Sequence, residues 1–217
     1  MRTDILDRTA SLLNTYSVKG FVIPANTGHS AKAVLDAFGT GYQYILVGNP
    51  VSSRAKGYVH HAGMSEETRK EFSELGMDVV LHEHSCFSQK KPSEAFWRYN
   101  ADFERSLCKR LGLDSLEIKG TSLSAIVEHT ARSFFDQGFK TAVEMALLAG
   151  GCPQADSRAF YVSFAFPSRW SDMRDVAIVS RVGTPTSFFT NGIDIQAVLF
   201  SNQPTKQNCS PSSPGDG

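Results

Sequence analysis

The sequence lacks an excess of charge of either sign. Lys and Arg together number 22, as do Asp and Glu, so the formal net charge of the 217 residues is zero at pH 7. Binding to nucleic acid or to an anionic membrane relies on an excess of basic residues. The balance therefore argues against nucleic acids and membranes as partners and favours a small-molecule ligand.

Cysteine is scarce, and its few positions are far apart. The four thiols show no C-x-x-C pair and no His at metal-ligand spacing, so we expect reduced thiols rather than disulfides or a zinc site. They belong to Cys86, Cys108, Cys152 and Cys209.

Long apolar runs are also missing. No run approaches the ~20 residues needed to span a bilayer, and Met1–Asp7 lacks the apolar core of a secretory signal. These absences predict a cytoplasmic protein. The length favours a single domain, which we expect over residues 1–202, with an aromatic-rich insertion near 88–102. The Ser- and Pro-rich stretch 203–217 predicts a disordered tail.

Apolar periodicity indicates alternating helices and strands. Two short apolar strands joined by a helix predict a parallel, right-handed βαβ unit and hence an α/β fold. Residues 141–148 fit either a strand or a buried helix, and Gly138 is expected to end the helix before them. The expected helices are 4–18, 30–38, 65–75, 103–111 and 121–137, and the expected strands are 21–23, 42–47, 77–81, 159–165, 176–180 and 193–200.

The turn after the first strand is the strongest candidate for a binding site. It runs from Asn26 to Ser30 and opens the next helix, where unpaired N–H groups and the positive end of the helix dipole attract anions. Gly28 has no Cβ to obstruct an approaching anion, and Thr27 and Ser30 add hydroxyls. The spacing matches neither G-x-G-x-x-G nor a P-loop. An ordinary helix cap is the alternative, because Asn, Thr and Ser are favoured N-cap residues.

Residues just beyond the other strands are further candidates, because open α/β sheets bind ligands outside the carboxyl ends of their strands. An Arg in such a loop could pair with a phosphate bidentately, and a Trp could stack on a flat ring. The alternative for both is surface packing. The candidate cofactor-binding residues are Gly48, Asn49, Gly150, Gly151, Arg169 and Trp170, in addition to Asn26, Thr27, Gly28, His29 and Ser30.

Acid–base chemistry would need a proton carrier, and Glu144 is one candidate. It lies inside an apolar run, where an unpaired carboxylate is costly. It is either a structural carboxylate bonded to backbone N–H groups or a general acid or base. His84 and His29 are proton carriers by type, although loop histidines are more often solvated.

A metal centre and a catalytic triad find no support in the spacing. His82 and His84 share a face of a strand, but no third ligand is indicated, so we predict no metal. No Ser-His-Asp arrangement can be assigned, and Cys86 beside His84 is only a weak hint of a nucleophile.

Several short motifs, in this order over about residues 8–202, resemble the stand-alone relatives of the pyruvate kinase C-terminal domain. None is specific alone, and their order carries the resemblance. They are Thr27–Ala31, Glu104–Ser106, Arg132–Lys140, Val143–Ala149, Asp175–Val179 with Arg181, Ser187–Phe189 and Ile193–Ile195.

This resemblance implies a three-layer α/β sandwich with a mostly parallel sheet and a phosphate pocket at the carboxyl edge. The stand-alone members resemble binders of flavin mononucleotide (FMN). The chain departs from the family pattern at His29, at Gly48–Pro50, in the insertion 88–102 and in the loop 167–174. Because these departures fall where a ligand is expected, a specialised ligand or reaction is plausible.

Three functions stay open from the sequence. The first is binding of FMN or a similar phosphorylated molecule, with phosphate at Thr27–Ser30 and the ring near Trp170. The second is a cofactor-independent isomerase, cyclase or lyase acting on a carbonyl compound, with Glu144 and His84 as proton carriers. The third is a non-catalytic effector-binding or assembly module that uses the aromatic insertion. The aromatic content is also compatible with a homo-oligomer.

Overall fold

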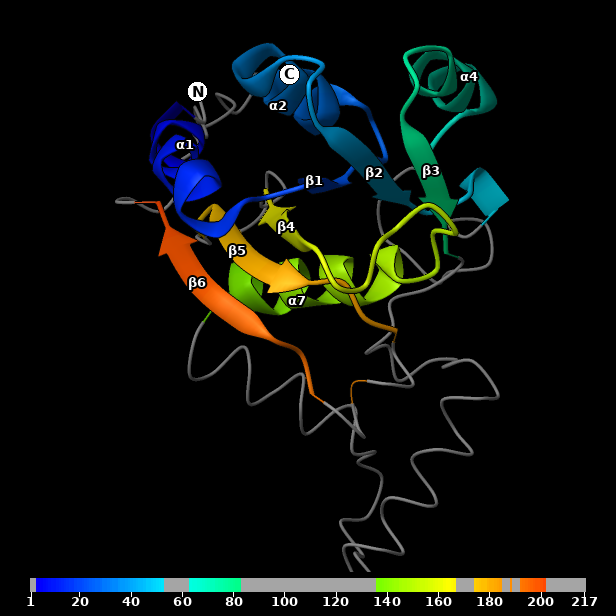
Figure 1. Cartoon of the computed structure of the whole chain (residues 1–217). Helices are drawn as coiled ribbons and strands as arrows, with labels where there is room; N and C mark the ends of the chain where they lie inside the picture. The colour runs from blue at the N-terminus through cyan, green and yellow to red at the C-terminus, as the bar shows by residue number, and fades with distance from the viewer. Residues whose placement is uncertain are drawn as a thin grey trace, which may run out of the picture.

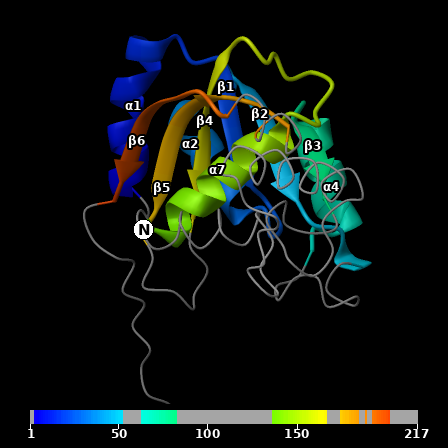
Figure 2. The same ribbon diagram turned by 90° about the horizontal axis from the view of Figure 1, so that it is seen from below.

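A computed structural model of the chain describes residues 3–52, 63–82, 136–166, 174–184, 188 and 192–201. They contain a six-stranded sheet in the order β3-β2-β1-β4-β5-β6, with helices on both faces (Figures 1 and 2). The α/β fold expected from the sequence is therefore confirmed at this level. The expected helix 103–111, most of 121–137, the insertion and the tail lie outside the described residues.

The described elements follow the predicted ones closely. The first helix, the first βαβ unit and the last three strands begin and end within a few residues of their expected positions. The helices are α1 (Thr3–Tyr16), α2 (His29–Phe38), α4 (Glu66–Glu74) and α7 (Gln137–Ala149), and the strands are β1 (Gly20–Pro24), β2 (Gln43–Gly48), β3 (Asp78–Leu81), β4 (Phe160–Ala165), β5 (Val176–Arg181) and β6 (Ile195–Phe200).

The sheet is parallel over four strands and antiparallel at one end. β1 pairs in parallel with β2 on one side and with β4 on the other, so Val22 lies between Ile45 and Ser163. β2 pairs in parallel with β3. β5 and β6 then join in antiparallel fashion. The predicted parallel βαβ unit is present, and the sheet as a whole is mixed.

Alternation of side chains along the strands separates two apolar clusters. On β1, Phe21 and Ile23 face the cluster that contains residues of α1, α2 and α4, whereas Val22 faces the cluster that contains α7. All three side chains are fully buried. The sheet therefore lies between a layer of three helices and a layer containing α7, as Figure 1 shows.

Helix α7 decides the ambiguous apolar run 141–148, because this run lies inside the helix. Ten of its 13 residues are buried, as is typical of a helix that is apolar on nearly every side. Gly138 lies in the first turn of α7, so the prediction that it ends a helix is wrong. A Cβ at this position would lie 2.6 Å from the carbonyl oxygen of Arg174, so Gly138 allows α7 to approach the residues before β5.

Helix α1 covers the exposed edge of the sheet. The guanidinium of Arg8 donates to the carbonyl of Phe200, and the hydroxyl of Tyr16 donates to the carbonyl of Gln196 at 3.4 Å. Both acceptors belong to the edge strand β6. No helix in the described part of the chain is long and apolar enough to cross a membrane.

Candidate functional site

The strand order reverses beside β1, and this reversal marks the part of the sheet where a ligand site is expected. From β1 the chain passes through α2 to β2 on one side, whereas β4 on the other side follows α7. α2 and α7 cover opposite faces of the sheet. In open α/β sheets, ligands bind outside the carboxyl ends of the strands at such a reversal. The turn Asn26–Ser30 lies at this position.

The N-terminus of α2 has no side-chain cap. Its N-cap residue is Gly28, in a left-handed conformation. By contrast, the Ser65 hydroxyl accepts from the Thr68 N–H at the start of α4, and the Asp136 carboxylate accepts from the Gly138 N–H at the start of α7. No described residue accepts a hydrogen bond from the backbone N–H of Thr27, Gly28 or His29. These donors are therefore available to an anion.

The structure shows why position 28 is a glycine, for a reason that the sequence did not show. Its φ is +76°, a conformation that side chains disfavour. A Cβ at this position would also lie 2.9 Å from Cε2 of Phe72 in α4. The missing side chain therefore allows the turn to adopt its conformation and to pack on Phe72, whereas the sequence had suggested access for an anion.

Two side chains of the turn point into solvent. Thr27 and His29 are exposed, and Nδ1 of His29 lies 3.3 Å from Oγ1 of Thr27. Ser30 is half-buried. The imidazole and the hydroxyl are thus accessible beside the three N–H donors, and both can form hydrogen bonds with a phosphate ester.

The carboxyl ends of β1, β2 and β3 are joined by side-chain hydrogen bonds. Oδ1 of Asn26 accepts from the backbone N–H of Asn49 at 2.7 Å. Nδ2 of Asn49 donates to the carbonyl of His82 at 2.7 Å. The structure therefore brings together Asn26, Asn49 and His82, as the sequence predicts for residues that follow neighbouring parallel strands.

The predicted pair Gly150–Gly151 occupies two different surroundings. A Cβ on Gly150 would lie 1.7 Å from the carbonyl oxygen of Gly183, so this glycine permits a close backbone approach. A Cβ on Gly151 would lie 3.8 Å from Nε2 of His82. Only Gly151 therefore adjoins a residue at the carboxyl edge of the sheet.

Glu144 lies in α7, on the opposite face of the sheet from α2. Its Oε2 lies 2.9 Å from Nζ of Lys140, and each side chain is only 6% exposed. No described contact joins Glu144 to the turn Asn26–Ser30. The sequence reasoning missed Lys140 as a partner, although residues four apart on a helix are neighbours and Lys140 stands four positions before Glu144.

Three of the predicted site residues lie outside the described part of the chain: His84, Arg169 and Trp170. Within the part that is described, no group of three or more His, Cys, Asp or Glu residues could hold a metal ion. Comparisons with models of known protein families and with curated proteins found no match to this sequence.

The amino edge of the sheet contains a polar network that the sequence analysis missed. The Tyr161 hydroxyl donates to Oε1 of Gln43 at 2.9 Å and accepts from the N–H of Asp156 at 3.0 Å. Nε2 of Gln43 donates to Oδ2 of Asp78 at 2.8 Å and to the carbonyl of Gln154 at 3.2 Å. These residues are scattered along the sequence, so only the strand register brings them together.

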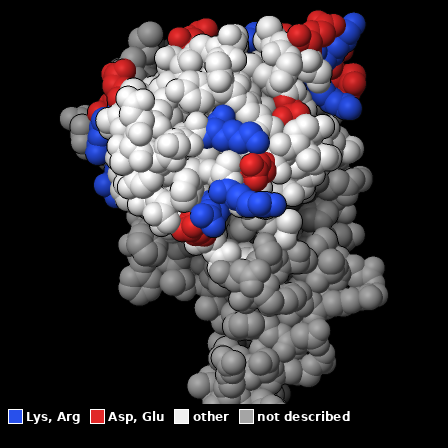
Figure 3. Space-filling view, in the orientation of Figure 1, with Lys and Arg blue, Asp and Glu red and all other residues white. Residues whose placement is uncertain are grey.

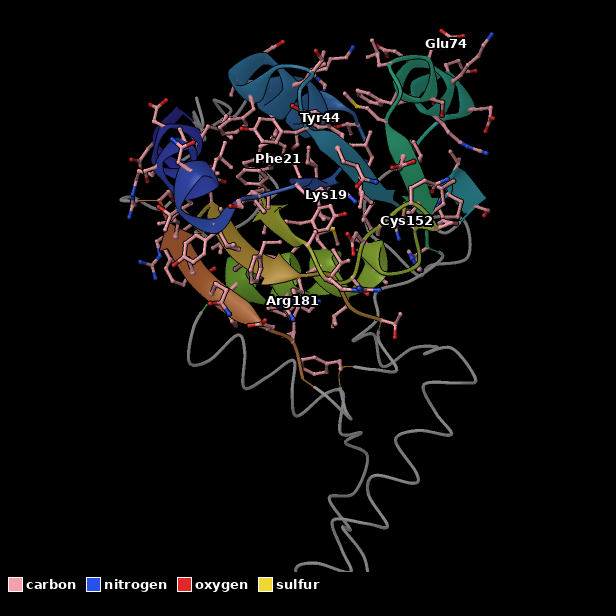
Figure 4. All side chains as sticks on the ribbon, viewed as in Figure 1. Lys19, Phe21, Tyr44, Glu74, Cys152 and Arg181 are labelled. Carbon is pink, nitrogen blue, oxygen red and sulfur yellow. The ribbon has the colours of Figure 1, made fainter. Side chains whose placement is uncertain are left out.

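Charged and sulfur-containing side chains complete this amino edge, where Lys19 and Cys152 lie on the same side of the molecule (Figure 4). Lys19 lies 3.6 Å from the carboxylate of Asp156. The Arg158 N–H and, to a lesser degree, Lys19 lower the pKa of Asp156. Burial raises the pKa of Cys152, which keeps its thiol protonated and a poor nucleophile.

The two edges of the sheet therefore differ chemically. At the amino edge, the polar groups just described bond to one another, and the face in Figure 3 carries interspersed charges of both signs. At the carboxyl edge, three backbone donors in the turn Asn26–Ser30 have no acceptor among the described residues. The carboxyl edge is the better candidate for a ligand site.

Proposed function

We propose that this protein binds a phosphorylated small molecule, with the phosphate at the turn Asn26–Ser30. The observation that carries the proposal is the uncapped N-terminus of α2 at the reversal of strand order. Free N–H groups at a helix N-terminus and the positive end of the helix dipole both favour an anion. The exposed Thr27 hydroxyl and His29 imidazole would contribute further hydrogen bonds.

FMN is the specific ligand that we propose within this class. Its support is the sequence resemblance to the stand-alone relatives of the pyruvate kinase C-terminal domain. In this proposal Arg169 assists the phosphate and Trp170 stacks on the isoalloxazine ring, as the residue types allow. A non-catalytic module that binds a phosphorylated effector would use the same turn.

Acid–base catalysis by Glu144 and His84 is a separate hypothesis. No described contact links Glu144 to the phosphate turn, and its described partner is Lys140. The phosphate-binding proposal therefore does not depend on Glu144.

Phosphate binding can be tested by removing one backbone donor without removing the helix. Proline is tolerated at the first position of a helix, so His29→Pro deletes one N–H without ending α2. It also disfavours the ψ of −19° at Gly28, so it disturbs the turn as well as removing the donor. His29→Ala is the matched control, because it removes the imidazole and keeps the N–H. The wild type is titrated with inorganic phosphate while its amide NMR spectrum is recorded. Phosphate should change the amide chemical shifts of Thr27, Gly28 and His29. We expect His29→Pro to weaken binding about tenfold relative to His29→Ala.

Two results would reject the phosphate site: no shift of these amides at high phosphate, or equal phosphate affinities of the two variants. The FMN proposal has its own measurement, which is the visible absorption of the purified protein before and after addition of FMN. Uptake of FMN that phosphate reverses would support it. A protein that binds phosphate but fails to take up FMN would reject flavin and retain the phosphate site.

A further inference from the structure

The backbone pairing of β1, β2 and β3 is extended at the carboxyl edge by two carboxamide side chains. The last backbone bonds run from the Ala25 N–H to the carbonyl of Val47 at 3.0 Å and from the His82 N–H to the carbonyl of Gly48 at 2.9 Å. Beyond them, Asn26 accepts from the Asn49 N–H, and Nδ2 of Asn26 lies 3.3 Å from its acceptor, Oδ1 of Asn49. The Asn49 side chain then donates to His82.

The fold makes room for the Asn26 carboxamide. A Cβ on Gly48 would lie 3.2 Å from Oδ1 of Asn26 and 3.2 Å from Cε of Met64. Such contacts are tighter than a Cβ ordinarily makes, so a larger residue at position 48 would press on the carboxamide. The Met64 N–H donates to the carbonyl of Asn49 at 2.7 Å and holds Asn49 from a second direction.

From this arrangement we infer that Asn26 is the positioning residue of the turn before α2. Its side chain offers a donor and an acceptor at once, and Asn49 uses both. An Asp would lack the donor. Because Asn26 immediately precedes Thr27, Gly28 and His29, fixing its side chain to β2 restricts the three N–H donors to one arrangement before a ligand arrives. Such preorganisation lowers the entropy cost of binding.

The inference has one consequence for the backbone and one for the ligand, and the second rests on the proposed phosphate site. In Asn26→Ala, both hydrogen bonds to Asn49 are lost, whereas Asn49→Ala keeps the bond from its own N–H to Asn26. We therefore expect the larger effect from Asn26→Ala. Asn14→Ala is the matched control, because Asn14 is exposed on α1.

The measurement is backbone NMR relaxation of the full chain, with and without inorganic phosphate. In Asn26→Ala we expect the order parameters of Thr27, Gly28 and His29 to fall from rigid values near 0.85 towards about 0.6. Phosphate affinity should fall about tenfold in Asn26→Ala, less in Asn49→Ala and not at all in Asn14→Ala. A role confined to overall stability would lower the melting temperature but leave the order parameters and the phosphate affinity unchanged.

The backbone result separates this inference from the proposed function. If the order parameters of the turn are the same in Asn26→Ala and Asn14→Ala, the inference is overturned, whatever the phosphate affinities of the variants are. If the wild type fails to bind phosphate but Asn26→Ala loosens the turn, the positioning role stands and the proposed function fails. If the wild type binds phosphate and Asn26→Ala binds it equally well, Asn26 does not position the donors.

Discussion

The backbone at Gly28 is left-handed and lies against the ring of Phe72. Gly28→Ala should therefore destabilise the fold through two costs, the strained conformation and the clash with the ring. We expect the free energy of unfolding to fall by about 2 to 4 kcal/mol. Urea denaturation of the variant and the wild type measures this difference.

Gly76 provides the matched control for this experiment. Its φ is +75°, but a Cβ would meet nothing within 4 Å. Gly76→Ala should thus show the conformational cost alone, about 1 kcal/mol. Equal losses of stability in the two variants would mean that the contact of the added Cβ with Phe72 costs no free energy.

A second residue-scale prediction concerns two buried serines. Ser163 is fully buried, and its hydroxyl has no hydrogen-bond partner among the described residues. Ser201 is also buried, but its hydroxyl accepts from the Asp175 N–H at 3.1 Å. Burying an unbonded hydroxyl costs free energy, whereas removing a bonded one leaves its partner unsatisfied.

The same chemical change should consequently have opposite effects at the two positions. Ser163→Ala should leave stability unchanged or raise it by about 1 kcal/mol, and Ser201→Ala should lower it by about 1 to 2 kcal/mol. Thermal and urea unfolding provide the comparison. Destabilisation by Ser163→Ala beyond that of Ser201→Ala would indicate that the Ser163 hydroxyl has a partner, such as a buried water.

At the scale of elements, the buried ion pair of α7 allows a mutant cycle. Removing one member of a buried ion pair typically costs about 3 to 5 kcal/mol. We expect losses of that order from Lys140→Met and from Glu144→Leu. The double variant should lose much less than the sum, because neither charge remains. Additive losses in urea unfolding would show that Lys140 and Glu144 do not stabilise each other.

The same helix shows what local patterns can and cannot predict. The amphipathic helices and the short β-branched strands were predictable, because their periodicities differ. The run 141–148 was ambiguous, since an element buried on nearly every side has no polar face to reveal its period. Gly138 was misassigned because glycine ends many helices, and only the approach of Arg174 explains its place inside α7.

At the scale of the whole molecule, Gln43 connects parts of the chain that are distant in sequence. Its side chain bonds to Asp78, Gln154 and Tyr161, the last 118 residues away. Gln43→Met keeps much of the volume but leaves the buried Tyr161 hydroxyl without its acceptor. We expect a loss of about 2 to 4 kcal/mol in global stability.

Gln196→Met is the control for this change, because Gln196 is exposed on the edge strand β6. Its stability should stay within about 0.5 kcal/mol of the wild type. Chemical denaturation followed by two probes, fluorescence and circular dichroism, measures both variants. A Gln43→Met protein as stable as Gln196→Met would show that the amino-edge network is energetically neutral.

The candidate site at the carboxyl edge follows from strand order and was predictable, whereas the network at the amino edge follows from strand register and was not. The carboxyl-edge position of Asn26 and Asn49 could be expected, because parallel neighbouring strands end together. The hydrogen bonds of Gln43 could not, because they depend on which residues face each other across strands far apart in sequence. The packing of Gly28 on Phe72 likewise needs the placement of α4.

The central position of β1 also has a consequence for how the chain folds. β1 can pair with β2 soon after both are synthesised, because only α2 separates them. Its pairing with β4 closes a much longer loop, in which Val22 meets Ser163. Long-range parallel pairing forms slowly, because the loop entropy is lost before the contacts compensate for it. One side of β1 therefore stays unpaired until β4 arrives, and during this interval it is exposed to association with other chains.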